Sequence, residues 1–295
     1  MSTENDVRLK GISLSRRSFV VGGALAAGAL AFGLTGCGGG EGGEGGTSNG
    51  TAAGGEAKDG VTKLRVGTGQ AGGYPWFDVD EQGNSTGYEA DILRKANELL
   101  PQYEFELQSI EMTTQLTELS NGTIDIGAHM YEDNQQRREN YLFSDVSIAT
   151  MTQEFAVLKD NNEFKSFEDL VGKRIVTYAS SNSAYALEQY NEENPDKPFE
   201  IIYAGAGDIL ASDLISGNAD ATLVDPLWLD YYTEAGLDLK IVTKVRFVET
   251  GVYYLFPKDG KHDQIKADLD VALKKLKDDG FIEELHQELF GYPAY

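Results

Sequence analysis

The stretch RIVTYASSNSAYALEQYNEENPDKPFEIIY, residues 174–203, decides the fold because it contains a strand, a helix and a second strand in succession. Residues 174–178 and 199–203 are rich in β-branched and aromatic side chains, which is typical of strands, whereas residues 183–193 favour a helix. Alternating strands and helices imply parallel sheets covered by helices. In such sheets ligands bind where strand ends meet helix N-termini.

The same alternation continues on both sides of this stretch. Pro101 stops one predicted helix, Asn121-Gly122 closes the next, and Pro226 opens a third at its first position. The predicted strands are 64–67, 124–128, 221–224, 239–242 and 252–256, and the predicted helices are 92–100, 116–121, one from 226, 263–277 and 280–290. The residues 166–169 form a start resembling a capping box.

Composition limits the classes of function. The chain has 295 residues, enough for two domains, and its formal net charge of −23 argues against nucleic-acid binding, which needs a basic face. One cysteine, Cys37, excludes an internal disulfide and Cys/His metal clusters. The three histidines lie far apart without metal-ligand spacing, so we expect neither a metal nor a cofactor.

The first segment predicts export and anchoring. Arg16-Arg17 match the twin-arginine export pattern, and an apolar run at 20–34 is too short for a good transmembrane helix. The run ends at Cys37 in a sequence that resembles the bacterial lipobox. Residues 1–36 are thus predicted to be an export signal, and 37–60 a lipidated cysteine, with palmitate among its lipids, followed by a flexible Gly/Glu-rich tether. This predicts an extracytoplasmic protein held on the bacterial cell membrane by lipid.

Several short segments, in order and spacing, resemble family 3 of the extracellular solute-binding proteins that serve polar amino-acid ABC importers. The resemblance covers residues 63–291. The segments that carry it are LRVGT (64–68), YPWF (74–77), GYEADI (87–92), LSNGTID (119–125), YLFSD (141–145), LVGKRI (170–175) and GNADA (217–221).

This resemblance implies an α/β fold of the two-lobed periplasmic-binding-protein type II, in which each lobe is a mainly parallel sheet flanked by helices. Lobe 1 would comprise 61–150 plus 251–295, and lobe 2 would comprise 155–246. Two crossover strands near 151–154 and 247–250 would join them, with the ligand in the cleft.

The resemblance also implies ligand contacts. Arg137 matches the arginine that grips the ligand α-carboxylate, a task suited to a planar guanidinium; the alternative is a surface arginine beside Arg138. Ser181 and Asn182 match the loop that presents hydroxyl and N–H groups to the same carboxylate, and Asp225 matches the acid that binds the α-ammonium. Each of these three is equally a residue that caps a helix N-terminus.

Other positions match or depart from the family pattern. Tyr74 matches the aromatic residue that covers the ligand side chain, and Tyr178 is a candidate pocket wall. Met112 stands where an aromatic is common, and Met130 and Glu132 replace small or hydroxyl residues. An acid at position 132 repels a carboxylate unless it pairs with an arginine or meets a ligand cation.

The segments LEQYN (187–191) and PDKP (195–198) are similar to those of members assigned to cystine, which makes cystine the leading ligand. The prediction is a monomeric, non-enzymatic binding lipoprotein that closes on an amino acid and delivers it to an ABC permease and its ATPase. Two alternatives stay open: a dehydratase on the same fold, with Glu132 or His129 as general acid, and a sensory domain.

Overall fold

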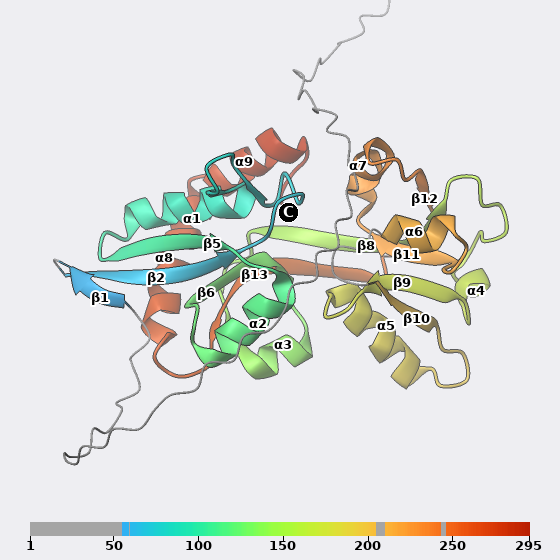
Figure 1. Ribbon diagram of the computed structural model, residues 1–295, viewed down its shortest axis with the longest axis horizontal. Helices are drawn as coiled ribbons and strands as arrows, with labels where there is room; N and C mark the ends of the chain where they lie inside the picture. Colours follow the sequence, from blue (N-terminus) through green and yellow to red (C-terminus); the bar gives the residue numbers. More distant parts are fainter. Residues whose placement is uncertain (1–54, 59, 205–209, 243–245) are drawn as a thin grey trace, which may run out of the picture. The chain divides into compact units, whose positions relative to one another are not determined.

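The computed structural model describes residues 55–58, 60–204, 210–242 and 246–295 (Figure 1). The predicted export signal, Cys37 and nearly all of the tether lie outside these described residues. None of the helices described in these ranges is both long and apolar enough to cross a membrane.

Most described strands belong to one sheet of 11 strands. Its main path runs β1-β2-β6-β13-β8-β11-β9-β10, with β5 paired to β2, β7 to β13 and β12 to β8, while β3 and β4 form a separate hairpin. The strands are β1 (Gly55–Lys58), β2 (Val61–Thr68), β3 (Asp78–Val79), β4 (Ser85–Thr86), β5 (Tyr103–Ser109), β6 (Ile126–Glu132), β7 (Tyr141–Phe143), β8 (Ala149–Leu158), β9 (Arg174–Tyr178), β10 (Glu200–Ala204), β11 (Ala221–Val224), β12 (Leu239–Ile241) and β13 (Val248–Pro257).

Helices cover both faces of the sheet. They are α1 (Tyr88–Leu99), α2 (Met112–Asn121), α3 (Gln135–Asn140), α4 (Phe167–Leu170), α5 (Asn182–Glu193), α6 (Leu210–Ile215), the 3-10 turn η1 (Pro226–Trp228), α7 (Leu229–Glu234), α8 (Asp263–Asp278) and α9 (Phe281–Phe290). Figure 1 shows α1 and α9 on one side of the strands and α2 and α3 on the other.

Strands β8 and β13 divide the sheet into two groups of elements. We call β1, β2, β5, β6 and β7, with α1–α3, α8 and α9, the first half, and β9–β12 with α4–α7 the second half. The pairs β2–β5 and β2–β6 are parallel, as are β9–β10 and β9–β11, whereas β8 and β13 pair antiparallel with their neighbours. The segments predicted as crossovers fall on β8 and at the start of β13.

Each half has its own apolar core, to which the dividing strands β8 and β13 also contribute. In the first half, Trp76, Tyr88 and Tyr254 are almost fully buried together with aliphatic residues of α1 and α8. In the second half, Phe155 and Phe199 lie in an aromatic cluster between β8 and α5. Burial of such rings removes about 150–250 Å² each from water, so both groups of elements are held mainly by apolar packing.

The alternating α/β architecture predicted from the sequence is confirmed. Gly122 caps α2 in the left-handed region (φ 67°), as the Asn-Gly signal indicated. Several predicted element starts need correction. The helices expected from 92 and 116 begin at Tyr88 and Met112, and the strands expected from 124 and 252 begin at Ile126 and Val248. The helix expected from Pro226 begins as a 3-10 turn before α7. The short helices α3 and α6 and strand β5 were not foreseen.

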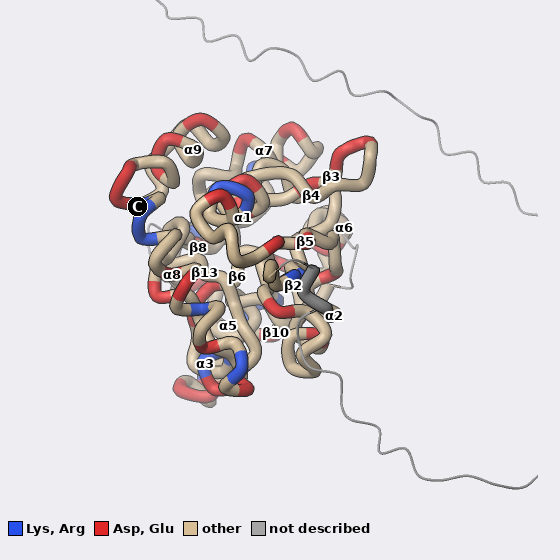
Figure 2. The backbone as a smooth tube through the Cα atoms, turned by 90° about the vertical axis from the view of Figure 1, so that its left-hand side faces the viewer, with Lys and Arg blue, Asp and Glu red and all other residues tan. Residues whose placement is uncertain are grey.

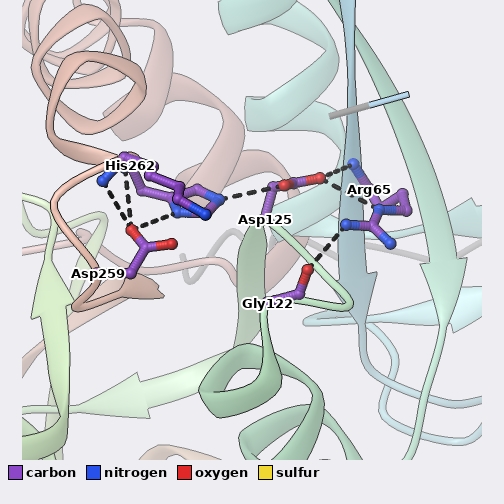
Figure 3. Close-up of polar contacts among 6 residues, drawn as sticks. Arg65, Gly122, Asp125, Asp259 and His262 are labelled. Atoms are coloured by element: carbon purple, nitrogen blue, oxygen red, sulfur yellow. Dashed lines mark hydrogen bonds and ion pairs between the residues drawn. The ribbon is translucent and has the colours of Figure 1, made fainter. Parts of the chain in front are cut away.

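A partly buried ionic cluster links β2 to the segments directly before β6 and α8 in the first half (Figure 3). Asp125, directly before β6, accepts hydrogen bonds from the backbone N–H of Arg65 (2.7 Å) and from its Nε (3.4 Å). The other Asp125 oxygen lies 3.1 Å from Nε2 of His262, whose Nδ1 lies 2.9 Å from Asp259. We call these four residues the Asp125 cluster.

Acidic positions are spread widely. In Figure 2 Asp and Glu occur on many helices and turns of the face in view, with fewer Lys and Arg between them. This distribution agrees with an acidic solvated surface rather than a single charged binding face.

Candidate functional site

Helix α3 places Arg137 at the junction of the two halves. Its N-cap is Asn134, whose Oδ1 accepts a 2.8 Å hydrogen bond from the backbone N–H of Arg137. The Arg137 side chain is only 6% exposed; Nη1 donates to the backbone oxygen of Glu132 (2.9 Å) and Nη2 to that of Ser180 (2.8 Å) in the second half. A guanidinium has five N–H groups, so these two contacts leave donors that a ligand carboxylate could use.

Glu132, the last residue of β6, bridges three segments. Its Oε1 accepts a 2.9 Å hydrogen bond from Nε2 of Gln153 on β8, and its Oε2 accepts a 3.1 Å bond from Nδ2 of Asn182 on α5. The residue is 7% exposed. The predicted site residues Glu132, Arg137 and Asn182 are therefore brought together directly, with the two halves linked through them.

Two further contacts extend this bridge. Oδ1 of Asn182 accepts from Nδ2 of Asn134 (2.9 Å), and Oε1 of Gln153 accepts from the hydroxyl of Ser183. We call Asn134, Asn182, Glu132, Gln153 and Ser183 the Glu132 bridge.

Burial raises the pKa of Glu132 to about 7, because the ionised form loses water. Hydrogen bonds from Asn182 and Gln153 and the charge of Arg137 lower the pKa of this carboxyl, but they do not outweigh burial, and Asp225 raises it further. Burial also lowers the pKa of Arg137, although the charge of Glu132 opposes that shift. An acid with a pKa near neutrality changes charge in the physiological range.

The loop before α5 has the features of an anion site and of a helix cap at once. The hydroxyl of Ser181 accepts from the backbone N–H of Ala184 (3.1 Å) and lies 3.1 Å from Oγ1 of Thr177. Ser180 has a positive φ of 64°, which turns its carbonyl toward Arg137. Ser181 thus makes the cap predicted as its alternative, and its ligand role stays a prediction.

Asp225 caps η1 and contacts β8. Its Oδ1 accepts from the N–H of Leu227 (2.9 Å) and its Oδ2 from the N–H of Thr152 (3.2 Å). The residue is buried, and burial raises its pKa. Because Thr152 precedes Gln153, Asp225 lies beside the Glu132 bridge, where its charge acts on Glu132.

The other predicted site residues are Tyr74, Tyr178, Met112 and Met130. Tyr74 is 45% exposed on the loop before β3, and Tyr178, at the end of β9, is 40% exposed. Met112 begins α2 and packs against an apolar cluster. Met130 has a φ of 52°, and its N–H donates to the carboxyl of Glu89 (3.0 Å).

A contact near Tyr74 also joins the halves. The hydroxyl of Tyr231 on α7 donates to the backbone oxygen of Gly72 (3.1 Å). On another side, a cavity of about 480 Å³ is lined by Asn134, Asn182 and Tyr185 together with the start of β13, Val248–Thr250. This cavity borders the Asn134–Asn182 end of the Glu132 bridge.

Gln153, Asn134 and Ser183 were missed from the sequence, although two signals were present. Apolar and polar residues alternate along ATMTQEF (149–155), and Gln153 takes the position of an apolar residue between Met151 and Phe155. A buried amide in that position demands a hydrogen-bond partner. Asn134 stands three residues before Arg137, where an asparagine N-cap is expected.

Comparison with known proteins identifies the family. Residues 64–292 match the model of the bacterial extracellular solute-binding proteins, family 3. The chain is 34% identical over 233 residues to the L-cystine-binding protein TcyK of Bacillus subtilis, covering 78% of this chain and 84% of the relative. It is 29% identical to the L-cystine-binding protein TcyJ of the same organism, covering 72% and 78%.

The chain is also similar to a solved structure. A protein of Listeria monocytogenes, provisionally named an L-cystine ABC transporter, superposes with a TM-score of 0.70 at 32% identity, covering 79% of this chain and 98% of that one. The chain belongs to family 3 of the bacterial extracellular solute-binding proteins.

Proposed function

We propose that this protein captures a polar amino acid outside the cytoplasm, with L-cystine as the leading ligand, and delivers it to an ABC permease and its ATPase. The observation that carries this proposal is the buried Arg137, held between the halves with N–H groups left over for an acceptor. The relatives named for L-cystine support the choice of ligand.

The arrangement suits capture by closure. The carboxylate of the ligand would meet Arg137 and the N-terminus of α5, where backbone N–H groups favour an anion. Its ammonium would meet Asp225 from the second half. Because groups on both halves are needed, ligand binding favours the conformation in which the halves are close. Tyr74 would cover the ligand side chain, and Met112, Met130 and Tyr178 would complete the wall.

The same proposal includes an anchor. Cys37 would carry lipids, palmitate among them, and residues 38–60 would tether the binding domain, which acts as a monomer, to the cell membrane. Mass spectrometry of the membrane fraction measures this directly: a diacylglyceryl adduct on an N-terminal Cys37 is expected. An intact chain with a free Cys37 thiol would show that the anchor is absent.

The binding test uses the full chain with Cys37→Ser, because a free thiol exchanges with the disulfide of cystine. Calorimetric titration with L-cystine is expected to give saturable one-site binding. Arg137→Ala should weaken binding roughly 10- to 100-fold, since a charge-assisted hydrogen bond contributes about 1.5–3 kcal/mol.

The matched control is Arg138→Ala. Arg138 is the adjacent arginine, but its Nε and Nη2 are each 2.7 Å from an oxygen of Asp133 instead of reaching the second half. Its removal should leave affinity within about twofold. If both variants bind as the parent does, Arg137 is not the anchor. If neither L-cystine nor any of the twenty amino acids binds the parent, the proposed ligand class is wrong.

A further inference from the structure

The Glu132 bridge has two arms that respond differently to a proton on Glu132. One arm runs from Glu132 through Asn182 to Asn134, and the other runs from Glu132 through Gln153 to Ser183. The direction of each hydrogen bond follows from which atoms can only donate or only accept.

The asparagine arm has one direction only. Oδ1 of Asn134 accepts from the backbone N–H of Arg137, which can only donate, so Nδ2 of Asn134 must donate onward. Oδ1 of Asn182 receives that bond, which leaves Nδ2 of Asn182 to donate to Glu132. The backbone of α3 therefore fixes this arm as a donor to Glu132 in either charge state.

The glutamine arm can run in either direction. With Glu132 ionised, the hydroxyl of Ser183 donates to Oε1 of Gln153, and Nε2 of Gln153 donates to Glu132. A hydroxyl can also accept. When Glu132 is protonated, a half-turn of the Gln153 amide lets its Oε1 accept from the acid and its Nε2 donate to Ser183. The exchange moves one proton onto Glu132 and breaks no covalent bond.

We propose that Gln153 and Ser183 are positioning residues whose reversible amide and hydroxyl orientation keeps Glu132 bridging the two halves in both of its protonation states. The inference rests on the proposed function in one respect, namely that the junction it holds is the proposed ligand cleft. It assigns Glu132 to the junction itself, where the sequence had placed it among ligand contacts.

The charges around Glu132 make this adaptability useful. The groups that act on it are the guanidinium of Arg137 on α3 and the carboxyl of Asp225 before η1. Burial is the larger effect and raises the pKa of Glu132 to about 7. Relative to an unfolded pKa near 4.5, this acid contributes stability that is full below pH 4.5 and is lost as pH rises through about 7. If the Gln153–Glu132 hydrogen bond could run in only one direction, it would be lost in one of the two protonation states of Glu132.

The first test compares the ligand-free full chain with its Glu132→Gln variant, both carrying Cys37→Ser, by thermal unfolding from pH 4.5 to 8.5. Glutamine at 132 donates to a turned Gln153 and accepts from Asn182, as protonated Glu132 does. The two midpoints should coincide near pH 4.5, and the variant should unfold roughly 3–10 °C higher at pH 8. Parallel profiles, or a variant that is less stable at pH 8, would overturn the inference.

A second variant tests the glutamine arm. Gln153→Met keeps the volume and removes both the donor and the acceptor. In the parent, the fall in stability should move to higher pH, because Glu132 loses a donor that favours its ionised form. In the Glu132→Gln background, the cost of Gln153→Met should be the same at every pH. In the parent, Gln153→Met should cost stability at pH 4.5, where it removes the acceptor for protonated Glu132, and more at pH 8, where it removes the donor to the ionised form. A cost confined to pH 8 would show that Gln153 only donates and would overturn the inference.

Two measurements keep the result attributable to Glu132. The first is to repeat the comparison in the Asp225→Asn background, which removes the neighbouring acid. The difference in unfolding midpoint between chains with and without Glu132→Gln should still depend on pH. The ¹³C carboxyl resonance of Glu132 in the parent, assigned by its loss in Glu132→Gln, should titrate near pH 7. A midpoint below about 5 would overturn the inference even if a variant fails to fold.

Ligand titration separates this inference from the proposed function. The unfolding profiles contain no ligand, so the difference between the parent and the Glu132→Gln variant reports on Glu132 and not on ligand binding. L-cystine binding without the pH-dependent difference would leave the proposed function standing and contradict the bridge. The pH-dependent difference without L-cystine binding would support the bridge and contradict the ligand.

Discussion

Asp125 lies directly before strand β6, and Glu132 is the last residue of that strand. Both carboxyls are buried, but their pKa values are shifted in opposite directions. Burial alone would raise the pKa of Asp125, but hydrogen bonds from His262 and Arg65 hold it below its usual range. Burial raises the pKa of Glu132 to about 7, since its partners are the neutral amides of Asn182 and Gln153. An arginine and a histidine that donate to the carboxyl favour its ionised form, whereas the two amides do not outweigh the effect of burial.

Glu89 extends the comparison. It is fully buried in the first turn of α1, and the only described hydrogen-bond donor to its carboxyl is the backbone N–H of Met130. Burial raises its pKa to about 8. The three carboxyls thus rank by what faces them: an arginine and a histidine with a raised pKa, two amides with a nearby arginine, and a single backbone N–H.

The largest effect is expected at the Asp125 cluster. Asp125→Ala leaves His262 and Arg65 buried or half-buried without their shared carboxylate, and removing one partner of a buried ion pair costs about 3–5 kcal/mol. Urea unfolding at pH 6 measures the loss. A cost below about 1 kcal/mol would show that the cluster is as weak as a surface ion pair.

Glu89→Gln should raise the stability of the protein at high pH, whereas Asp125→Ala lowers stability. An acid with a raised folded pKa gives stability that is full below its unfolded pKa near 4.5 and is lost as pH rises through about 8. Glutamine keeps an oxygen for the N–H of Met130 and cannot ionise, so the variant should gain about 2–4 kcal/mol at pH 8 and nothing near pH 4.5. Urea unfolding at both pH values measures this, and a loss at pH 8 would show that ionised Glu89 is required.

The sequence patterns predicted the helices and strands better than they predicted the contacts between the two halves. Leucine and isoleucine spacing, Pro101 and Gly122 marked helices because local propensity and burial agree there. The order of family segments pointed to Arg137, Asn182 and Glu132, which the structure brings together.

The partners of those residues could not be read in the same way. Gln153 and Ser183 are 30 positions apart, and Asn134 and Asn182 are 48 apart, so only the tertiary fold makes them neighbours. Likewise, His262 meets Asp125 across 137 positions. The sequence suggested that Glu132 needed an arginine or a ligand cation, but the hydrogen bonds to its carboxyl come from two amides.

The smallest effect is expected at the exposed end of the Asp125 cluster, where Asp259 is one-third exposed. Burial lowers the pKa of His262, but the hydrogen bonds it donates to Asp125 and Asp259 raise that pKa above its usual value. The stabilisation is therefore full below about pH 6.5 and is lost as pH rises through the folded pKa. Asp259→Asn keeps an oxygen for Nδ1 and removes one charge, so it should cost about 1 kcal/mol at pH 6 and less at pH 9. Urea unfolding at both pH values measures this cost. An equal cost at pH 6 and 9 would show that the Asp259 carboxyl stabilises the loop only by accepting from backbone N–H groups, and that Asp125 alone stabilises the charge of His262.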